Sequence, residues 1–112
     1  METNELELGP QPLDEMMKKW EISNHQMVDV STEQLTHKQV QRARTGRRLT
    51  LKMMQKVNRA FNVTIWFRLN DEQKERYFEY MHKHLFNYAK GFDPEFVDPN
   101  ETIRAELTEP QD

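Results

Sequence analysis

The sequence predicts an all-α protein in which four short helices are followed by a longer C-terminal helix. Apolar residues recur at helical spacing near the N-terminus, and helix-capping patterns recur along the chain. The third observation is size. The 112 residues, 31% charged and 36% hydrophobic, suffice for one small domain with a modest core.

Apolar spacing and N-terminal capping patterns predict the first two helices. The first carries apolar residues at i, i+3, i+4 and i+7, namely Leu13, Met16, Met17 and Trp20. Pro12 introduces it, because proline suits the first helical position. Ser23 and Gln26 have the capping-box spacing of a second helix, and Ile22 and Met27 are placed to form a hydrophobic staple across that start.

Two more helices follow. Thr36 and Gln39 repeat the capping-box pattern, and Gly46 is expected to end the third helix, since glycine tolerates the left-handed conformation. A fourth helix starts near Thr50. Its expected inward residues are Met53, Met54, Val57, Ala60 and Phe61.

Between residues 63 and 69, every second residue belongs to an apolar set, namely Val63, Ile65, Phe67 and Leu69. This period of two predicts a short strand or an extended linker. A long helix is then expected from Asn70, with Gln73 completing a capping box, to Lys90. Its apolar stripe is Phe78, Met81, Leu85, Tyr88 and Phe92. Tyr80 and Phe86 lie off the stripe.

Charge is sorted along the chain and suggests its organisation. Residues 1–12 contain three acids and no base, and residues 93–112 contain seven acids against Arg104 alone. We therefore expect a flexible acidic N-terminal arm (1–12), a helical domain (13–63), an extended segment with the C-terminal helix (64–92) and an acidic flexible tail (93–112).

A basic block interrupts this acidic chain. Between residues 36 and 59 there are eight basic residues and no Asp or Glu: Lys38, Arg42, Arg44, Arg47, Arg48, Lys52, Lys56 and Arg59. The whole chain has a net charge of −3. A concentrated positive field on short helices favours a polyanionic partner.

Three stretches of the chain resemble the helix-turn-helix domain of the phage-repressor/Cro (Xre) type. The segment 22–28 is similar to that family's second helix and the turn before it. The segment 40–46 resembles its third helix, with the same six-residue step from an apolar anchor to glycine, and 49–63 resembles its fourth. The likeness covers residues 13–63, although no glycine lies between Asp29 and Leu35.

The resemblance implies sequence-specific binding of double-stranded DNA by a transcriptional regulator, with helix 36–45 in the major groove. The side chains on the face expected to contact bases are His37, Lys38, Gln41, Arg42 and Thr45. Those expected to contact phosphates are Ser23, Asn24, Arg47, Arg48 and Lys52.

A homodimer is expected, because one short helix contacts too few base pairs for useful specificity. The C-terminal helix carries more apolar surface than one small bundle covers. The contact is therefore expected to involve Phe78, Met81, Leu85 and Phe86.

Two alternatives stay open. The domain could be a non-enzymatic protein-interaction module whose basic face binds an acidic protein. It could also bind RNA, with Trp66, Phe67 and the tyrosines stacking on bases. The basic and aromatic residues occupy different segments, which favours DNA.

No catalytic, cofactor or small-molecule site is expected. The chain lacks cysteine and a glycine-rich phosphate loop, and His82 and His84 project about 200° apart on a helix, so they cannot chelate one metal ion. We also expect no export signal or membrane span. The absence of cysteine suits a reducing cytoplasm.

Overall fold

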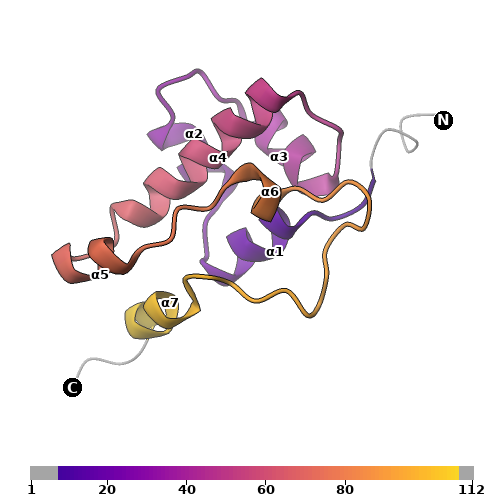
Figure 1. Cartoon of the computed structure of the whole chain (residues 1–112). Helices are drawn as coiled ribbons and strands as arrows, with labels where there is room; N and C mark the ends of the chain where they lie inside the picture. The colour runs from indigo at the N-terminus through magenta and orange to yellow at the C-terminus, as the bar shows by residue number, and fades with distance from the viewer. Residues whose placement is uncertain (1–7, 109–112) are drawn as a thin grey trace.

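The computed structural model describes residues 8–108, and within that range it contains seven helices and no strand (Figure 1). The helices are α1 (Pro12–Lys19), α2 (Asn24–Val30), α3 (His37–Thr45), α4 (Leu51–Trp66), α5 (Asp71–Arg76), α6 (His82–Leu85) and α7 (Glu101–Thr108). The all-α prediction is confirmed.

The first four helices begin where the sequence predicts. Pro12 is the first residue of α1, and capping boxes start α2 at Ser23 and α3 at Thr36. The Thr50 hydroxyl accepts the Met53 amide and so caps α4. These caps satisfy backbone amides that the helices themselves leave unpaired.

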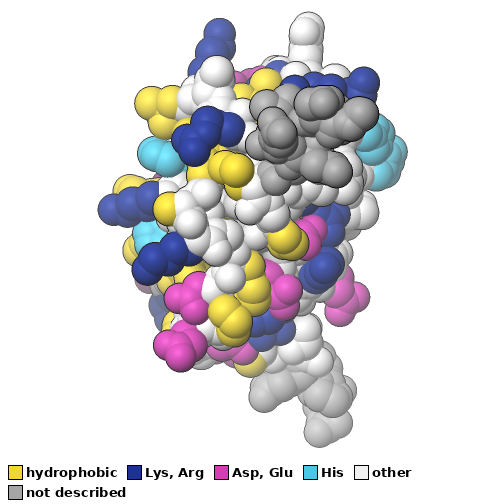
Figure 2. All heavy atoms as spheres, turned by 90° about the vertical axis from the view of Figure 1, so that its right-hand side faces the viewer, with side chains coloured by type: hydrophobic (Ala, Val, Ile, Leu, Met, Phe, Trp, Pro, Cys, Tyr) yellow, Lys and Arg dark blue, Asp and Glu magenta, His cyan; other side chains and the backbone are white. Residues whose placement is uncertain are grey.

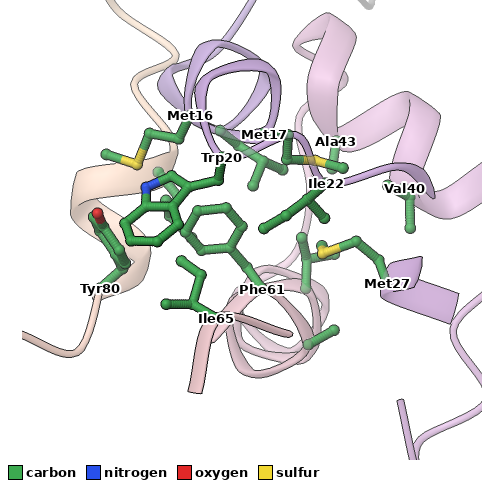
Figure 3. Close-up of a cluster of buried hydrophobic side chains, with 14 of the residues drawn as sticks. Met16, Met17, Trp20, Ile22, Met27, Val40, Ala43, Phe61, Ile65 and Tyr80 are labelled. Atoms are coloured by element: carbon green, nitrogen blue, oxygen red, sulfur yellow. The ribbon is translucent and has the colours of Figure 1, made fainter. Parts of the chain in front are cut away.

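The core lies between α1, α4 and the helices around them (Figure 3). Phe61 of α4 is fully buried, and its ring meets that of Tyr80 edge to face, with centroids 5.1 Å apart. The other labelled side chains that surround this centre are Met16, Met17, Trp20, Ile22, Met27, Val40, Ala43 and Ile65. One continuous apolar core therefore joins residues far apart in the sequence.

The predicted strand at 63–69 is wrong, because α4 continues to Trp66. Its buried residues, Val57, Ala60, Phe61, Thr64 and Ile65, keep the helical spacing through this region. The alternation of Val63, Ile65, Phe67 and Leu69 is not a strand pattern here, and the β-branched residues Val63, Thr64 and Ile65 are helical because packing against the core overrides their strand propensity.

The predicted long helix from residue 70 to 90 is also wrong. The chain forms α5, continues as an extended segment from Tyr77 to Met81, and forms only the single turn of α6. Two asparagines hold this segment as a neighbouring strand would. Asn62 binds the amide and carbonyl of Tyr80 (2.9 and 3.0 Å), and Asn100 binds those of Phe78 (2.8 and 2.7 Å).

This interruption buries the rings that a single helical stripe would have left outside. Tyr80 is fully buried, and Leu85 and Phe86 also lie in the core. Leu85 and Phe86 are therefore not available for the predicted dimer contact, whereas Phe78 and Met81 are exposed. The excess apolar surface expected of the C-terminal helix is absorbed largely within one chain.

The boundaries drawn by charge need correction at both ends. Residues 1–7 of the expected flexible arm lie outside the described residues, but the arm does not extend to residue 12. The Leu8 amide binds the Gly46 carbonyl (2.9 Å), and the Gln11 amide binds that of Arg44 (3.2 Å). Gln11 itself is fully buried.

The tail predicted to be flexible contains α7, which buries Ile103. Asp98 anchors the segment before α7. Its buried carboxylate accepts hydrogen bonds from the Trp20 indole (3.0 Å), the Tyr80 hydroxyl and the Asn100 amide (2.8 Å). A polar cluster thus attaches the C-terminal segment to the core.

Among the described residues, no helix is both long and apolar enough to cross a lipid bilayer.

Candidate nucleic-acid interface

The predicted base-contact residues all lie on α3, but they differ in how far their side chains are exposed. His37, Lys38 and Gln41 are exposed, whereas Arg42 and Thr45 are half-buried. Val40 and Ala43, on the opposite side of the helix, are fully buried in the core. The helix thus presents one polar face outward, as its sequence predicts.

A chain of polar contacts fixes α3 against the first two helices. The Arg44 guanidinium donates to Asp14 of α1 (2.6 Å) and to the side-chain oxygen of Asn24 in α2 (2.7 Å). The Asn24 amide nitrogen in turn donates to the Gln41 side-chain oxygen (3.0 Å). Because Arg44 and Asp14 are largely shielded from water, this ion pair positions the helices more firmly than an exposed pair would.

These contacts change the roles available to two predicted site residues. Asn24 is engaged through both of its side-chain groups, and the Gln41 oxygen is occupied. Gln41 as a whole is nevertheless exposed.

The eight basic residues of the 36–59 block divide into two groups. Arg44 is held internally, Arg59 makes a two-bond ion pair with Glu33 (2.5 and 2.8 Å), and Lys56 lies 3.4 Å from the Gln34 carbonyl. The hydrogen bond from Arg59 lowers the pKa of Glu33. These three bases have partners within the chain.

The other five form what we call the open cationic surface, consisting of Lys38, Arg42, Arg47, Arg48 and Lys52. Within residues 8–108, no carboxylate oxygen lies within 4.0 Å of their side-chain nitrogens. They come from α3, from the loop after it and from the first turn of α4. Their charges are therefore available to a partner outside the described chain.

A shallow hollow lies at the centre of this surface. It has a volume of about 250 Å³, and its lining includes Arg42, Arg47, Arg48 and Thr50. Thr50 caps α4, a helix of 16 residues whose N-terminus carries a partial positive charge. Three guanidinium-bearing side chains and a helix N-terminus thus converge on one hollow, an arrangement suited to an anion.

Tyr88 supports the loop from the side. Its hydroxyl accepts the Leu49 amide (3.0 Å), and the Arg48 guanidinium lies over its ring, 5.1 Å from the centroid. Burial raises the pKa of Tyr88, so the phenol stays neutral as that acceptor. Sequence reasoning missed this residue, because Tyr88 lies far along the chain from the loop it contacts.

The N-terminal end of α2 lies beside that of α3. Ser23 is exposed, and its hydroxyl accepts the Gln26 amide within the capping box. The rings of His25 and His37 stack with centroids 5.6 Å apart. The two histidines are 12 positions apart in the sequence, and their contact exists only because α2 and α3 pack together.

Figure 2 views the molecule from the side on which the loop between α3 and α4 lies in Figure 1. Lys, Arg and His side chains prevail over the upper part of this face. Asp and Glu side chains lie mostly in its lower part, mixed with further basic residues. On this face, acidic side chains are therefore concentrated below and basic ones extend above them.

No group of three or more His, Asp or Glu side chains in the described part of the chain is arranged to hold a metal ion. Comparison of the chain with protein-family models, with curated proteins and with solved structures finds no match.

Proposed function

We propose that this protein binds double-stranded DNA in a sequence-specific manner and acts as a transcriptional regulator, with α1–α4 as a helix-turn-helix domain of the phage-repressor type. The observation that carries the proposal is the open cationic surface, defined above, beside the polar face of α3. In the proposed complex α3 enters the major groove, where Lys38, Arg42 and Gln41 reach base edges.

Phosphate binding completes the proposed interface. Arg47 and Arg48 line the hollow at the start of α4, Lys52 lies in the first turn of that helix, and one backbone phosphate bound there would be neutralised by these bases. Ser23 and the first amides of α2 would contact the phosphate on the other side of the groove. A second copy of the chain belongs to the proposal, because one nine-residue helix reads few base pairs.

The first experiment is selection from random double-stranded DNA, followed by affinity measurement with the enriched sequence. Arg42→Ala should weaken specific binding by about 1–3 kcal/mol and relax the preference at one base position, without changing thermal stability. Lys19→Ala is the control, since Lys19 is an exposed base on α1 outside this surface. Normal binding by Arg42→Ala would remove Arg42 from base recognition.

Salt dependence tests the phosphate contacts separately. Replacing both Arg47 and Arg48 with Ala should weaken specific and non-specific binding alike and reduce the salt slope by roughly two units. An unchanged slope would mean that neither side chain contacts a phosphate.

Competition separates DNA from the other partners considered. Binding without sequence preference that single-stranded RNA displaces would indicate an RNA-binding protein. Binding to acidic polypeptides in preference to any duplex would indicate a protein-interaction module.

A further inference from the structure

One face of α4 changes its chemistry along the helix. Side chains that recur every three or four residues share this face: Lys52, Lys56, Arg59, Val63 and Phe67, the last being the residue directly after the helix. The first three are basic and the last two are apolar. The face therefore runs from positive to apolar toward its C-terminal end.

Acidic residues continue the same progression. Asp71, Glu72 and Glu75 follow in α5, and all three are exposed. Glu72 lies 3.4 Å from Arg76 of the same helix, whereas Asp71 and Glu75 make no ion pair within residues 8–108. Along the chain, the basic part of α4 and its apolar end are thus followed by two acids without an ion-pair partner, beside Lys74 and Arg76 of the same short helix.

The apolar end of this α4 face has an exposed aromatic ring, Phe67, beside a hollow lined largely by apolar side chains. Phe67 is 75% exposed, the highest value of any aromatic side chain described. Beside it lies a hollow of about 240 Å³ between the end of α2 and α4, lined by Val30, Ala60, Val63 and Phe67 among others. The volume suits one inserted side chain better than a typical small-molecule ligand.

We propose that this face of α4 binds a second copy of the same chain, with the two α4 helices antiparallel and a two-fold axis near Val63. This inference deepens the proposed function and rests on it only for the need of a second copy. In an antiparallel pair, a residue four positions after Val63 meets the residue four positions before it. Phe67 of each copy therefore lies over Arg59 and enters the hollow of the other.

Charge complementarity selects the second copy as the occupant. The antiparallel arrangement brings the basic half of one α4 toward Asp71 and Glu75 of the other copy, the two exposed acids of α5 that make no ion pair within residues 8–108, and the two-fold axis repeats this match. Arg59 is already paired with Glu33, so the base of this face that would meet those acids is Lys56, whose nitrogen reaches the Gln34 carbonyl but makes no ion pair within residues 8–108. A parallel arrangement would instead set like charges against each other.

Cysteine cross-linking tests the position of the axis, because the chain contains no natural cysteine. Val63→Cys should form a covalent dimer under mild oxidation at least about tenfold faster than Val97→Cys, since only residues near the axis meet their own copy. Val97 is a matched control, being 77% exposed in the segment before α7. Equal rates for the two variants would overturn the proposal.

Sedimentation of the full chain without DNA tests the contact itself. The wild type should show reversible association, Phe67→Glu should raise the dissociation constant at least about tenfold, and Val97→Glu should leave it unchanged. A mixture of Lys56→Glu with the double variant Asp71→Lys and Glu75→Lys should associate more tightly than either variant alone.

A wild-type chain that stays monomeric at millimolar concentration would overturn the proposal, whatever other molecule covers the face. The DNA proposal fails by a different result, namely the absence of an enriched sequence in the selection. Self-association through Phe67 without any DNA preference would therefore support this inference while removing the proposed function.

Discussion

The two halves of the described chain are held together in different ways. In α1–α4, helices start at Pro12 or at side-chain caps and pack through apolar stripes that the sequence displays. In residues 67–108, short helices alternate with extended segments whose backbone groups are bound by Asn62, Asn100 and Asp98. Local signals organise the first half, and distant polar side chains organise the second.

This difference has a consequence for where stability is concentrated. Each cap in the first half contributes a modest and independent amount, whereas Asp98 joins α1, the extended segment and α7 at one carboxylate. Substitutions in the polar cluster should therefore be more damaging than substitutions of caps.

The largest effect is expected for Asp98→Ala, which should lower the free energy of unfolding by about 3–4 kcal/mol. The change leaves the Trp20 indole and the Tyr80 hydroxyl buried without their acceptor. Urea denaturation measures it. Glu95→Ala, an exposed acid of the same segment, should change stability by less than about 0.5 kcal/mol, and equal effects would contradict the anchoring role.

The second prediction concerns alkaline pH. Burial raises the pKa of Tyr77 and Tyr80 above the usual value of 10.0, and Asp98 adds to the shift of Tyr80. Because these pKa values are higher in the folded state, their contribution is complete below about pH 10 and is lost as pH rises further.

Above that pH, the free energy of unfolding should fall by about 1.4 kcal/mol per pH unit for each of the two tyrosines. Tyr77→Phe should reduce this slope by about 1.4 kcal/mol per pH unit in denaturation experiments over the alkaline range. If the substitution leaves the pH dependence of the free energy of unfolding unchanged, burial does not raise the pKa of Tyr77 in the folded protein.

Gly46→Ala tests whether Gly46 has two roles, ending α3 in the left-handed conformation and leaving room for the backbone of Gly9. Gly46 has φ +98°, and an added Cβ would lie 2.1 Å from the Gly9 carbonyl oxygen. We expect a loss of about 2 kcal/mol, because strain and a steric clash add. Gly9→Ala should cost about 1 kcal/mol, since φ is +100° but no atom lies within 4 Å.

Equal losses for the two glycine variants would mean that residues 8–10 do not lie against α3. The comparison therefore shows whether Gly46 only ends α3 or also leaves space for residues 8–10 to pack against this helix.

The smallest effect is expected for Thr36→Ala, about 1 kcal/mol, because it removes one hydroxyl that accepts the Gln39 amide. Thr36→Ser retains the acceptor and should be nearly neutral. A loss as large as that of Asp98→Ala would refute the distinction between the two halves.

The candidate site shows the same division between local and distant information. Helical spacing indicated which side of α3 faces outward, and Val40 and Ala43 are indeed buried. Spacing did not indicate that Arg44 binds Asp14 and Asn24, because those residues lie 30 and 20 positions away. The eight charges look equivalent in the sequence, and only packing separates five open ones from three with partners.

The sequence by itself determined the helical class, the starts of α1–α5 and the position of the basic block, since these depend on residues within one or two turns of each other. The tertiary structure decided that α4 continues through 63–66, that the 70–90 region breaks, and that α7 packs onto the core. Each outcome depends on long-range contacts, such as Asn62 with Tyr80 and Asp98 with Trp20, whose partners no local pattern identifies.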